Sequence, residues 1–289
     1  MSFREITSES ESFAEIHNGD IADNVVLSNS KTLTKNFQTK FRYFSTGAGR
    51  DAYSFVFEEN SISIPFIHVR SPPSRNNNPE LLKEALIKIM DVIQPNIENH
   101  GEGMAILNEN DKAILRDVLK LRGYDFNEGI NAAHMFYLSD QQMMHLAENA
   151  VTCSEGFVLS EVDVEKDAET IHNNWHYAGP FVATKNRLSH LPSVCAREIS
   201  TGKLVSWMMC LPFELMANLY TLPEYRGKGI ARAVEQEMCR KMMSLGLRPF
   251  KYVDDFNTTV IKTSLRNYTR WERDGKPVEI YFMTIEKAI

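Results

Sequence analysis

The hydrophobic positions of the first 150 residues follow two different periods. Apolar residues recur at spacings of three and four in 79–93 and in 110–121, which predicts two amphipathic helices. Short apolar runs predict strands at Tyr53–Phe57, Ile62–Val69 and Ala132–Leu138. Pro65 lies inside the second run and favours an edge strand or a bulge there. The first half is therefore predicted to mix helices and strands.

A new pattern of the same kind begins at Gly156. Asp163 is a suitable N-cap for an acid-rich helix that reaches residue 175. The predicted strands are Phe157–Val162, Ser193–Glu198, Leu204–Met209, Leu215–Leu222 and Phe250–Val253. Apolar residues from Ala231 to Leu245 fall on one helical face, and Gly246 ends that helix. The second half thus repeats the mixture of the first.

Length and composition favour two domains of an α/β protein. The chain has 289 residues and a net charge of −6, and we place the boundary between residues 150 and 151, giving domains 1–150 and 151–289. Residues 1–150 contain 14 basic and 21 acidic side chains, which argues against a nucleic-acid-binding protein. No apolar run approaches the roughly 18–20 residues of a membrane span. The acidic N-terminal region resembles neither a signal peptide nor a transit peptide, so we expect a cytoplasmic protein.

Cysteine and histidine patterns give no support for a metal site. The four cysteines form no CxxC pair and are expected to be reduced and mostly buried. His172 and His176 have the spacing of half a helical metal site, but the sequence offers neither a HExxH motif nor an evident third ligand. We expect surface or substrate-side histidines and no metal.

The most informative motif is Thr221–Ala231 (TLPEYRGKGIA), which joins a predicted strand to a predicted helix. Two spaced glycines let backbone N–H groups approach an anion, and the helix N-terminus adds positive potential. Residues 226–251 contain seven basic and two acidic side chains, which suits a ligand with several phosphates. The alternative is a simple glycine turn before a solvated basic helix. The motif matches neither the NTPase phosphate loop nor GxGxxG.

In this context Arg226–Ala231 resembles the acyl-CoA diphosphate loop of the GNAT N-acyltransferase superfamily. The longer run from Thr221, with Trp207, Val253-Asp254 and Asn257, is similar to the glycine N-acyltransferase family. The resemblance implies tandem GNAT-like folds, in which the N-terminal copy is degenerate and lacks the phosphate loop. It also implies direct transfer of an acyl group from acyl-CoA, acetyl-CoA or longer, to a small amine such as glycine. Acyl-CoA would be a co-substrate, with no prosthetic group.

The resemblance also implies where CoA binds. Pantetheine would lie between two splayed strands, the one ending at Leu222 and Phe250–Val253, and Asn257 would cap the next helix and contact CoA. The implied CoA-binding residues are Tyr220, Thr221, Leu222, Arg226, Gly227, Lys228, Gly229, Ile230, Ala231 and Asn257. The aromatic segment Trp175–Phe181 either lines the acceptor pocket or is a plain loop.

Catalysis requires a base for the proton of the amine and donors for the oxyanion. The resemblance places a catalytic Glu at position 215, which is Leu here, and Glu214 lies one residue earlier. A one-residue shift reverses the face of a strand, so Glu214 can be the base only if a bulge restores its direction. The alternative is a surface Glu in a hairpin connection. Ser264 replaces the general-acid Tyr of many GNAT enzymes, and Tyr268 is expected in the core or at its rim.

Two other functions remain open. The displacement of Glu214 leaves room for an acyl-CoA-binding protein without turnover, and the acidic first half permits acetylation of a protein or peptide amine. We expect a monomer whose partners are a CoA thioester and a small amine, without nucleic acid or membrane. The family resemblance also leaves a mitochondrial location open.

Overall fold

The computed structural model describes residues 3–10, 21–37, 39–49, 51–59, 64–72, 77–127, 132–212 and 216–288. The helices are α2 (Ile21–Asn36), α3 (Pro79–His100), α4 (Glu109–Leu121), α5 (Asp140–Glu148), α6 (Val164–Asn173), α7 (Phe181–His190), α8 (Ile230–Ser244) and α9 (Thr258–Asn267), with a 3₁₀ turn, η2 (Pro223–Tyr225). The strands are β1 (Arg4–Ile6), β2 (Phe41–Ser45), β3 (Ser54–Glu58), β4 (Phe66–Arg70), β5 (Glu102–Asn108), β6 (Tyr124–Asn127), β7 (Ala133–Tyr137), β8 (Phe157–Ser160), β9 (Ser193–Glu198), β10 (Leu204–Met209), β11 (Ala217–Thr221), β12 (Phe250–Asp254), β13 (Thr269–Arg270), β14 (Glu272–Arg273), β15 (Lys276–Pro277) and β16 (Glu279–Lys287).

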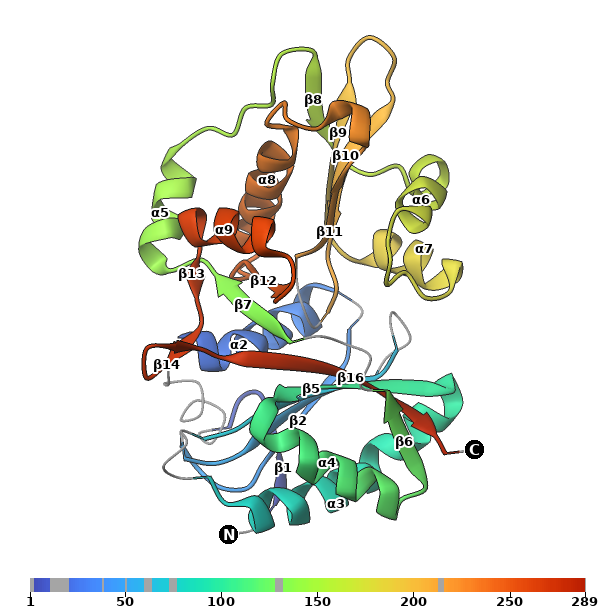
Figure 1. Cartoon of the computed structure of the whole chain (residues 1–289), viewed down its shortest axis with the longest axis vertical. Helices are drawn as coiled ribbons and strands as arrows, with labels where there is room; N and C mark the ends of the chain where they lie inside the picture. Colours follow the sequence, from blue (N-terminus) through green and yellow to red (C-terminus); the bar gives the residue numbers. More distant parts are fainter. Residues whose placement is uncertain are drawn as a thin grey trace.

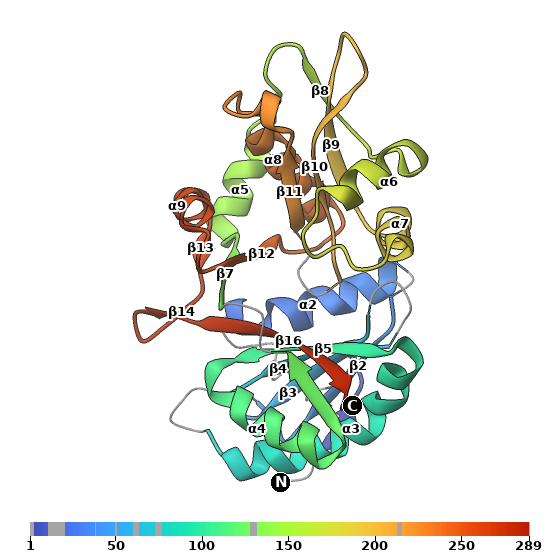
Figure 2. The ribbon, with the colours of Figure 1, turned by 45° about the vertical axis from the view of Figure 1, so that its right-hand side comes forward.

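The two halves repeat one order of elements. In the first half β2–β3–β4 is followed by α3, β5 and α4, and in the second half β9–β10–β11 is followed by α8, β12 and α9. Helices α3 and α4 cover one face of the first sheet, and α2 lies between that sheet and the second half (Figures 1 and 2). The predicted mixed α/β fold with two related halves is confirmed.

The halves exchange their last strands. β16, at the end of the chain, pairs with β5 and β6 of the first half. β7, at the end of the first half, pairs with β12 and β13 of the second half. The two exchanged strands also pair with each other, Glu279 with His134 and Ile280 with Ala133, so a ten-stranded sheet runs through both halves. The predicted boundary at residues 150/151 therefore does not separate two complete sheets.

This exchange predicts that the halves will not fold separately. A fragment 151–289 lacks β7, which leaves β12 and β13 without their central partner, and a fragment 1–150 lacks β16 between β5 and β6. Because unpaired strands expose backbone groups, we expect each fragment alone to be insoluble or unfolded. The two together should form one complex that elutes as a single species in size-exclusion chromatography. A monomeric fragment 151–289 with a cooperative thermal transition would contradict this.

Several local predictions are confirmed and several elements were missed. The side chain of Asp163 caps α6 by accepting from the Lys166 N–H at 3.3 Å. Helix α3 runs beyond residue 93, through Pro95, to His100, and the described part of the strand expected at 62–69 begins after Pro65. The sequence patterns did not reveal α2, α7, β5 or β16. Helix α2 is rich in Ser, Thr and Asn, which have low helix propensity, and it is held by packing between the halves.

Within the described residues, no helix combines the length and apolar composition needed to cross a bilayer.

Candidate functional site

The second half contains a gap between β11 and β12 that the first half lacks. β11 ends the four-stranded sheet β11-β10-β9-β8, whereas β12 ends the ten-stranded sheet, and no ladder within the described part of the chain joins them. The equivalent strands of the first half, β4 and β5, pair in parallel at Phe66↔Met104 and Ile67↔Ala105. The predicted parting of the strand that ends near Leu222 from Phe250–Val253 is confirmed. The first half is closed at the corresponding place.

β11 carries a bulge. Trp207 pairs with Tyr220 and Met209 pairs with Ala217, so β11 has one residue more than β10 over the same stretch. Asn218 supplies the kink with a φ of 51°, in the left-handed region that Asn tolerates better than most residues. An extra residue in a strand reverses the face of the strand residues that precede it. This bulge is the condition that Glu214 needs to act as the base, although Glu214 itself lies outside the described residues.

The loop after β11 leads into a helix whose first N–H groups are open. Gly227 and Gly229 both have a φ of 77°, which an L side chain rarely adopts, so both positions require glycine. Gly229 is the N-cap of α8 and has no side chain to accept from the first turn, unlike Asn257 at the start of α9. The Ser154 hydroxyl donates to the Lys228 carbonyl and fixes the outer side of the turn. The arrangement presents backbone N–H groups and the positive end of α8 to an anion.

Three basic side chains surround this helix end without a carboxylate partner in the described part of the chain: Arg226, Lys228 and Arg232. The Arg226 Nε donates to the Thr221 carbonyl at 3.0 Å and its guanidinium lies 5.3 Å from the Tyr220 ring. The Lys228 ammonium lies 5.2 Å from the Tyr225 ring. These contacts hold the Arg226 and Lys228 side chains in position without neutralising their charges. Uncompensated positive charge at a helix N-terminus suits a ligand with several negative charges.

Leu222 and Thr221, at the end of β11, differ in whether their backbone N–H groups are already hydrogen-bonded. Leu222 uses both backbone groups internally, because its N–H donates to the Val205 carbonyl at 2.9 Å and its carbonyl accepts from the Tyr225 N–H at 2.9 Å. Since alternate residues of an edge strand direct their backbone groups outward, the N–H of Thr221 faces away from β10. Of the predicted segment 220–222, Thr221 is therefore the residue whose backbone N–H is directed away from β10.

The structure shows the surroundings of three polar residues at or near α9: Asn257, Ser264 and Tyr268. Asn257 is exposed and its side chain accepts from the Val260 N–H at 3.3 Å, so its role as an N-cap is confirmed. Ser264 is 1% exposed and its hydroxyl has no hydrogen-bond partner among the described residues. Tyr268 is buried, as expected, and its hydroxyl lies 3.2 Å from the Cys239 sulfur. Burial raises the pKa of the Cys239 thiol to about 12, so this cysteine is inert.

A buried ion pair lies between α8 and β12. Lys251 bonds Glu235, and the two side chains are only 8% and 10% exposed. The Lys251 ammonium also lies 4.3 Å from the Tyr268 ring. The pair joins β12 to α8, because Lys251 lies on the strand and Glu235 on the helix. Either charge would be poorly solvated in this buried position if its partner were removed.

We expect Glu235→Gln to destabilise the protein by about 3–5 kcal/mol, the usual cost of leaving a buried charge uncompensated. The matched control is Glu161→Gln, which removes an ion pair to Lys241 whose carboxylate is 80% exposed and which should cost less than about 1 kcal/mol. Urea unfolding followed by tryptophan fluorescence measures both. Equal losses in the two variants would contradict the prediction.

The segment between α6 and α7 reaches across to β12. The Tyr177 hydroxyl donates to Asp254 at 3.3 Å. Burial raises the pKa of the Asp254 carboxyl, and the Tyr177 hydrogen bond partly offsets this. Arg187 holds the same segment, since it donates to the Ala178 carbonyl at 3.3 Å and its guanidinium lies 5.2 Å from the Trp175 ring. This contact does not distinguish the two alternatives for Trp175–Phe181, lining of an acceptor pocket and a plain loop.

The histidines show no metal arrangement. His172 contacts the Thr184 hydroxyl at 3.0 Å, and the exposed His176 packs its ring against Tyr177. Among the residues with described positions, no group of three His, Cys, Asp or Glu could hold a metal ion.

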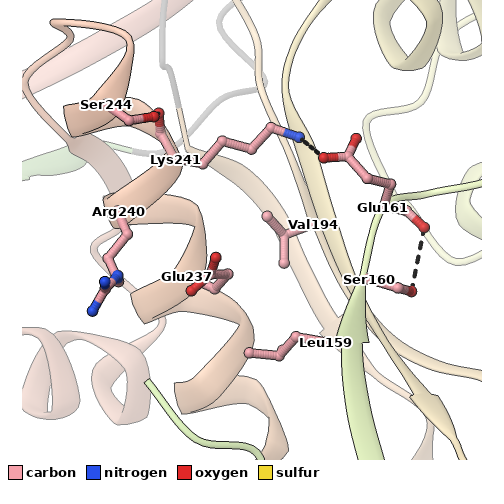
Figure 3. A pocket seen from close by; sticks show the side chains of 8 residues that line it. All are labelled: Leu159, Ser160, Glu161, Val194, Glu237, Arg240, Lys241 and Ser244. Carbon is pink, nitrogen blue, oxygen red and sulfur yellow. Dashed lines mark hydrogen bonds and ion pairs between the residues drawn. The ribbon is translucent and has the colours of Figure 1, made fainter. Parts of the chain in front are cut away.

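A cavity of about 460 Å³ lies on the other side of α8, between that helix and β8 (Figure 3). Its lining residues are Leu159, Ser160, Glu161, Val194, Glu237, Arg240, Lys241 and Ser244. Lys241 bridges it by bonding Glu161 at 2.6 Å, and Arg240 donates to the Asn149 carbonyl at 2.7 Å. Because its cations are already engaged, we assign no ligand to it.

Comparisons with known proteins agree with this fold. Residues 193–265, which contain β11, the glycine turn and α8, match the model of the FR47-like protein family. A Drosophila protein of known structure is 12% identical, with a TM-score of 0.66 over 99% of this chain and 98% of that one. A GCN5-related N-acetyltransferase from Kribbella flavida is 14% identical, with a TM-score of 0.52 over 91% and 95%. A putative GNAT-family acetyltransferase from Novosphingobium aromaticivorans is 13% identical, with a TM-score of 0.50 over 94% and 100%.

These likenesses extend over both halves, which confirms the predicted GNAT fold. The narrower resemblance to glycine N-acyltransferases is not reproduced by them. The chain therefore has a GNAT-like fold, and its residues 193–265 match the FR47-like family model.

Proposed function

We propose that this protein transfers an acyl group from acyl-CoA to a small amine. The observation that carries the proposal is the open, basic N-terminus of α8, preceded by a bulged strand and placed beside the gap between β11 and β12. The diphosphate of CoA would bind the N–H groups of Gly227–Ala231, with Arg226 and Lys228 supplying charge. Pantetheine would enter the gap and bond Thr221. The fold likeness to N-acetyltransferases supports this choice of ligand.

The reaction then needs no covalent enzyme intermediate. The amine nitrogen attacks the thioester carbonyl, the C–S bond breaks, and the thiolate leaves to be protonated by water. Glu214 would take the proton of the amine, and the bulge in β11 is the feature that this role requires. We propose an amino acid such as glycine as the acceptor, on the resemblance of Thr221–Arg226 to glycine N-acyltransferases.

The alternative proposal, binding of acyl-CoA without turnover, depends on the direction of Glu214. An assay that measures thiol release tests both. Acetyl-CoA and longer acyl-CoAs are each combined with a panel of amino acids, polyamines and a lysine-containing peptide. Thiol release with amino acids supports the glycine-like acceptor, and release only with the peptide supports a protein acceptor. CoA binding by calorimetry without thiol release from any pair would leave a binding protein.

We also propose that only the second half binds CoA. The first half has its counterpart strands β4 and β5 paired, and its sequence has no RGxG turn. Calorimetry of the full chain with CoA should give one site per chain. A stoichiometry of two would contradict this.

A further inference from the structure

A second cavity, of about 390 Å³, lies where α5, α8 and the end of α9 meet. These three helices are grouped on one side of the second half in both views (Figures 1 and 2). The lining residues are Leu138, Gln141, Gln142, His145, Leu146, Arg232, Glu235, Gln236, Cys239, Arg266, Asn267 and Tyr268. Its volume is in the range of small-molecule sites.

The charge of this cavity is positive and not compensated. Arg232 of α8 and Arg266 of α9 make no hydrogen bond or ion pair within the described part of the chain, and both are exposed. The one carboxylate of the lining, Glu235, is bonded to Lys251. Two guanidinium groups from different helices therefore face one cavity without a counter-charge.

The other arginines of this region are engaged, which makes these two unusual. Arg240 donates to the Asn149 carbonyl, and Arg248 bonds Asp140. Within the described residues, the guanidinium N–H groups of Arg232 and Arg266 therefore remain available to a ligand that enters the cavity.

We propose that the α5–α8–α9 cavity binds the phosphate monoester group of a small ligand. A guanidinium offers a planar pair of N–H donors that fits phosphate oxygens, and two of them match the double charge of a phosphate monoester. The Gln141 and Gln236 amides supply further donors, while Leu138, Leu146 and Tyr268 give an apolar wall for the rest of the ligand. Arg232 lies in the first turn of α8, three residues after Gly229.

The phosphate has two conceivable sources. One is the 3′-phosphate of a CoA held at the glycine turn, and this source rests on the proposed function. The other is a separate phosphorylated metabolite, which does not. The two share the same chemistry in the cavity and differ in whether CoA occupies it.

The test uses phenyl phosphate as a probe and calorimetry of the full chain. The variant is Arg266→Gln, and the matched control is Lys262→Gln, an exposed lysine one turn earlier on α9 that does not line the cavity. Because a charge-assisted bidentate contact is lost, we expect phenyl phosphate to bind Arg266→Gln at least about 10-fold more weakly than the wild type and the control. Equal binding to all three proteins, or no binding to any, would overturn the proposal.

Competition then identifies the source. If the site takes the 3′-phosphate of CoA, saturating CoA excludes phenyl phosphate, 3′-dephospho-CoA does not, and Arg266→Gln removes the preference for CoA over 3′-dephospho-CoA. If the ligand is separate, phenyl phosphate binds equally with either cofactor present. If the protein binds no CoA at all, the proposed function fails, while the phenyl phosphate comparison still decides the cavity.

Discussion

Gly229→Asp is expected to abolish CoA binding. The residue is the N-cap of α8, where the positive end of the helix and the open N–H groups are proposed to hold the diphosphate. A carboxylate placed there would occupy these N–H groups itself and repel the ligand, so we expect affinity to fall by about 10²-fold or more. Calorimetry with CoA measures the loss.

The left-handed conformation of Gly229 dictates the control. Any side chain at a φ of 77° introduces strain, so a loss in Gly229→Asp alone would not identify charge as the cause. Gly229→Asn has nearly the same size, and Asn tolerates this conformation as Asp does. If Gly229→Asn loses as much affinity as Gly229→Asp, the negative charge is not the cause, because an Asn side chain can also accept from these N–H groups. If both variants bind CoA as the wild type does, the proposed site is wrong.

Glu214→Gln is expected to reduce the acyl-transfer rate by about 10²-fold or more, within the range of a general base. CoA affinity should not change, because the proposed diphosphate site lies at the other end of β11. The pH–rate profile should lose the decline at low pH that protonation of the carboxylate causes, since Gln does not titrate in this range. Steady-state thiol release over a range of pH values measures both.

Glu169→Gln is the matched control for this variant, because Glu169 is an exposed glutamate on α6. It should leave both the rate and the pH profile unchanged. A Glu214→Gln enzyme with wild-type rate at every pH would show that another group, or solvent acting on a neutral amine, accepts the proton.

The glycine turn is the part of the site that the sequence revealed most directly. Arg226–Ala231 carries a local signal, because glycines that need positive φ and a following amphipathic helix are both visible over a short stretch. The same holds for the caps at Asp163 and Asn257, where a short polar side chain precedes a helical pattern. These features depend on residues within a few positions of one another.

The sequence did not predict the bulge in β11. It showed only that Glu214 would need such a bulge to act as the base. Glu214 is one residue away from the position that the family resemblance implies, and no local pattern showed how the strand would correct this. The bulge itself arises from the register of β11 against β10, in which Tyr220 and Ala217 face Trp207 and Met209. Register depends on both strands and on what covers their faces, so a single strand's sequence does not contain it.

The exchange of β7 and β16 was not visible at all. β7 has five residues and β16 has nine, and neither sequence identifies the sheet that it joins. The pattern of the chain suggested two self-contained domains. Only the assembled sheet shows that residues 279–287 pair with β5 and β6, far away in sequence. The cavity with Arg232 and Arg266 has the same origin, because its two cations come from separate helices whose approach depends on packing.

The sequence by itself thus determined the fold class, the helices with clear periodicity, the free cysteines and the glycine turn, because each depends on local spacing and composition. The tertiary structure alone decided three other features: the opening between β11 and β12, the strand exchange between the halves, and the convergence of unpaired charges. Each of these depends on which surfaces meet when the chain closes on itself. That outcome is set by burial and backbone pairing between residues that are far apart in the sequence.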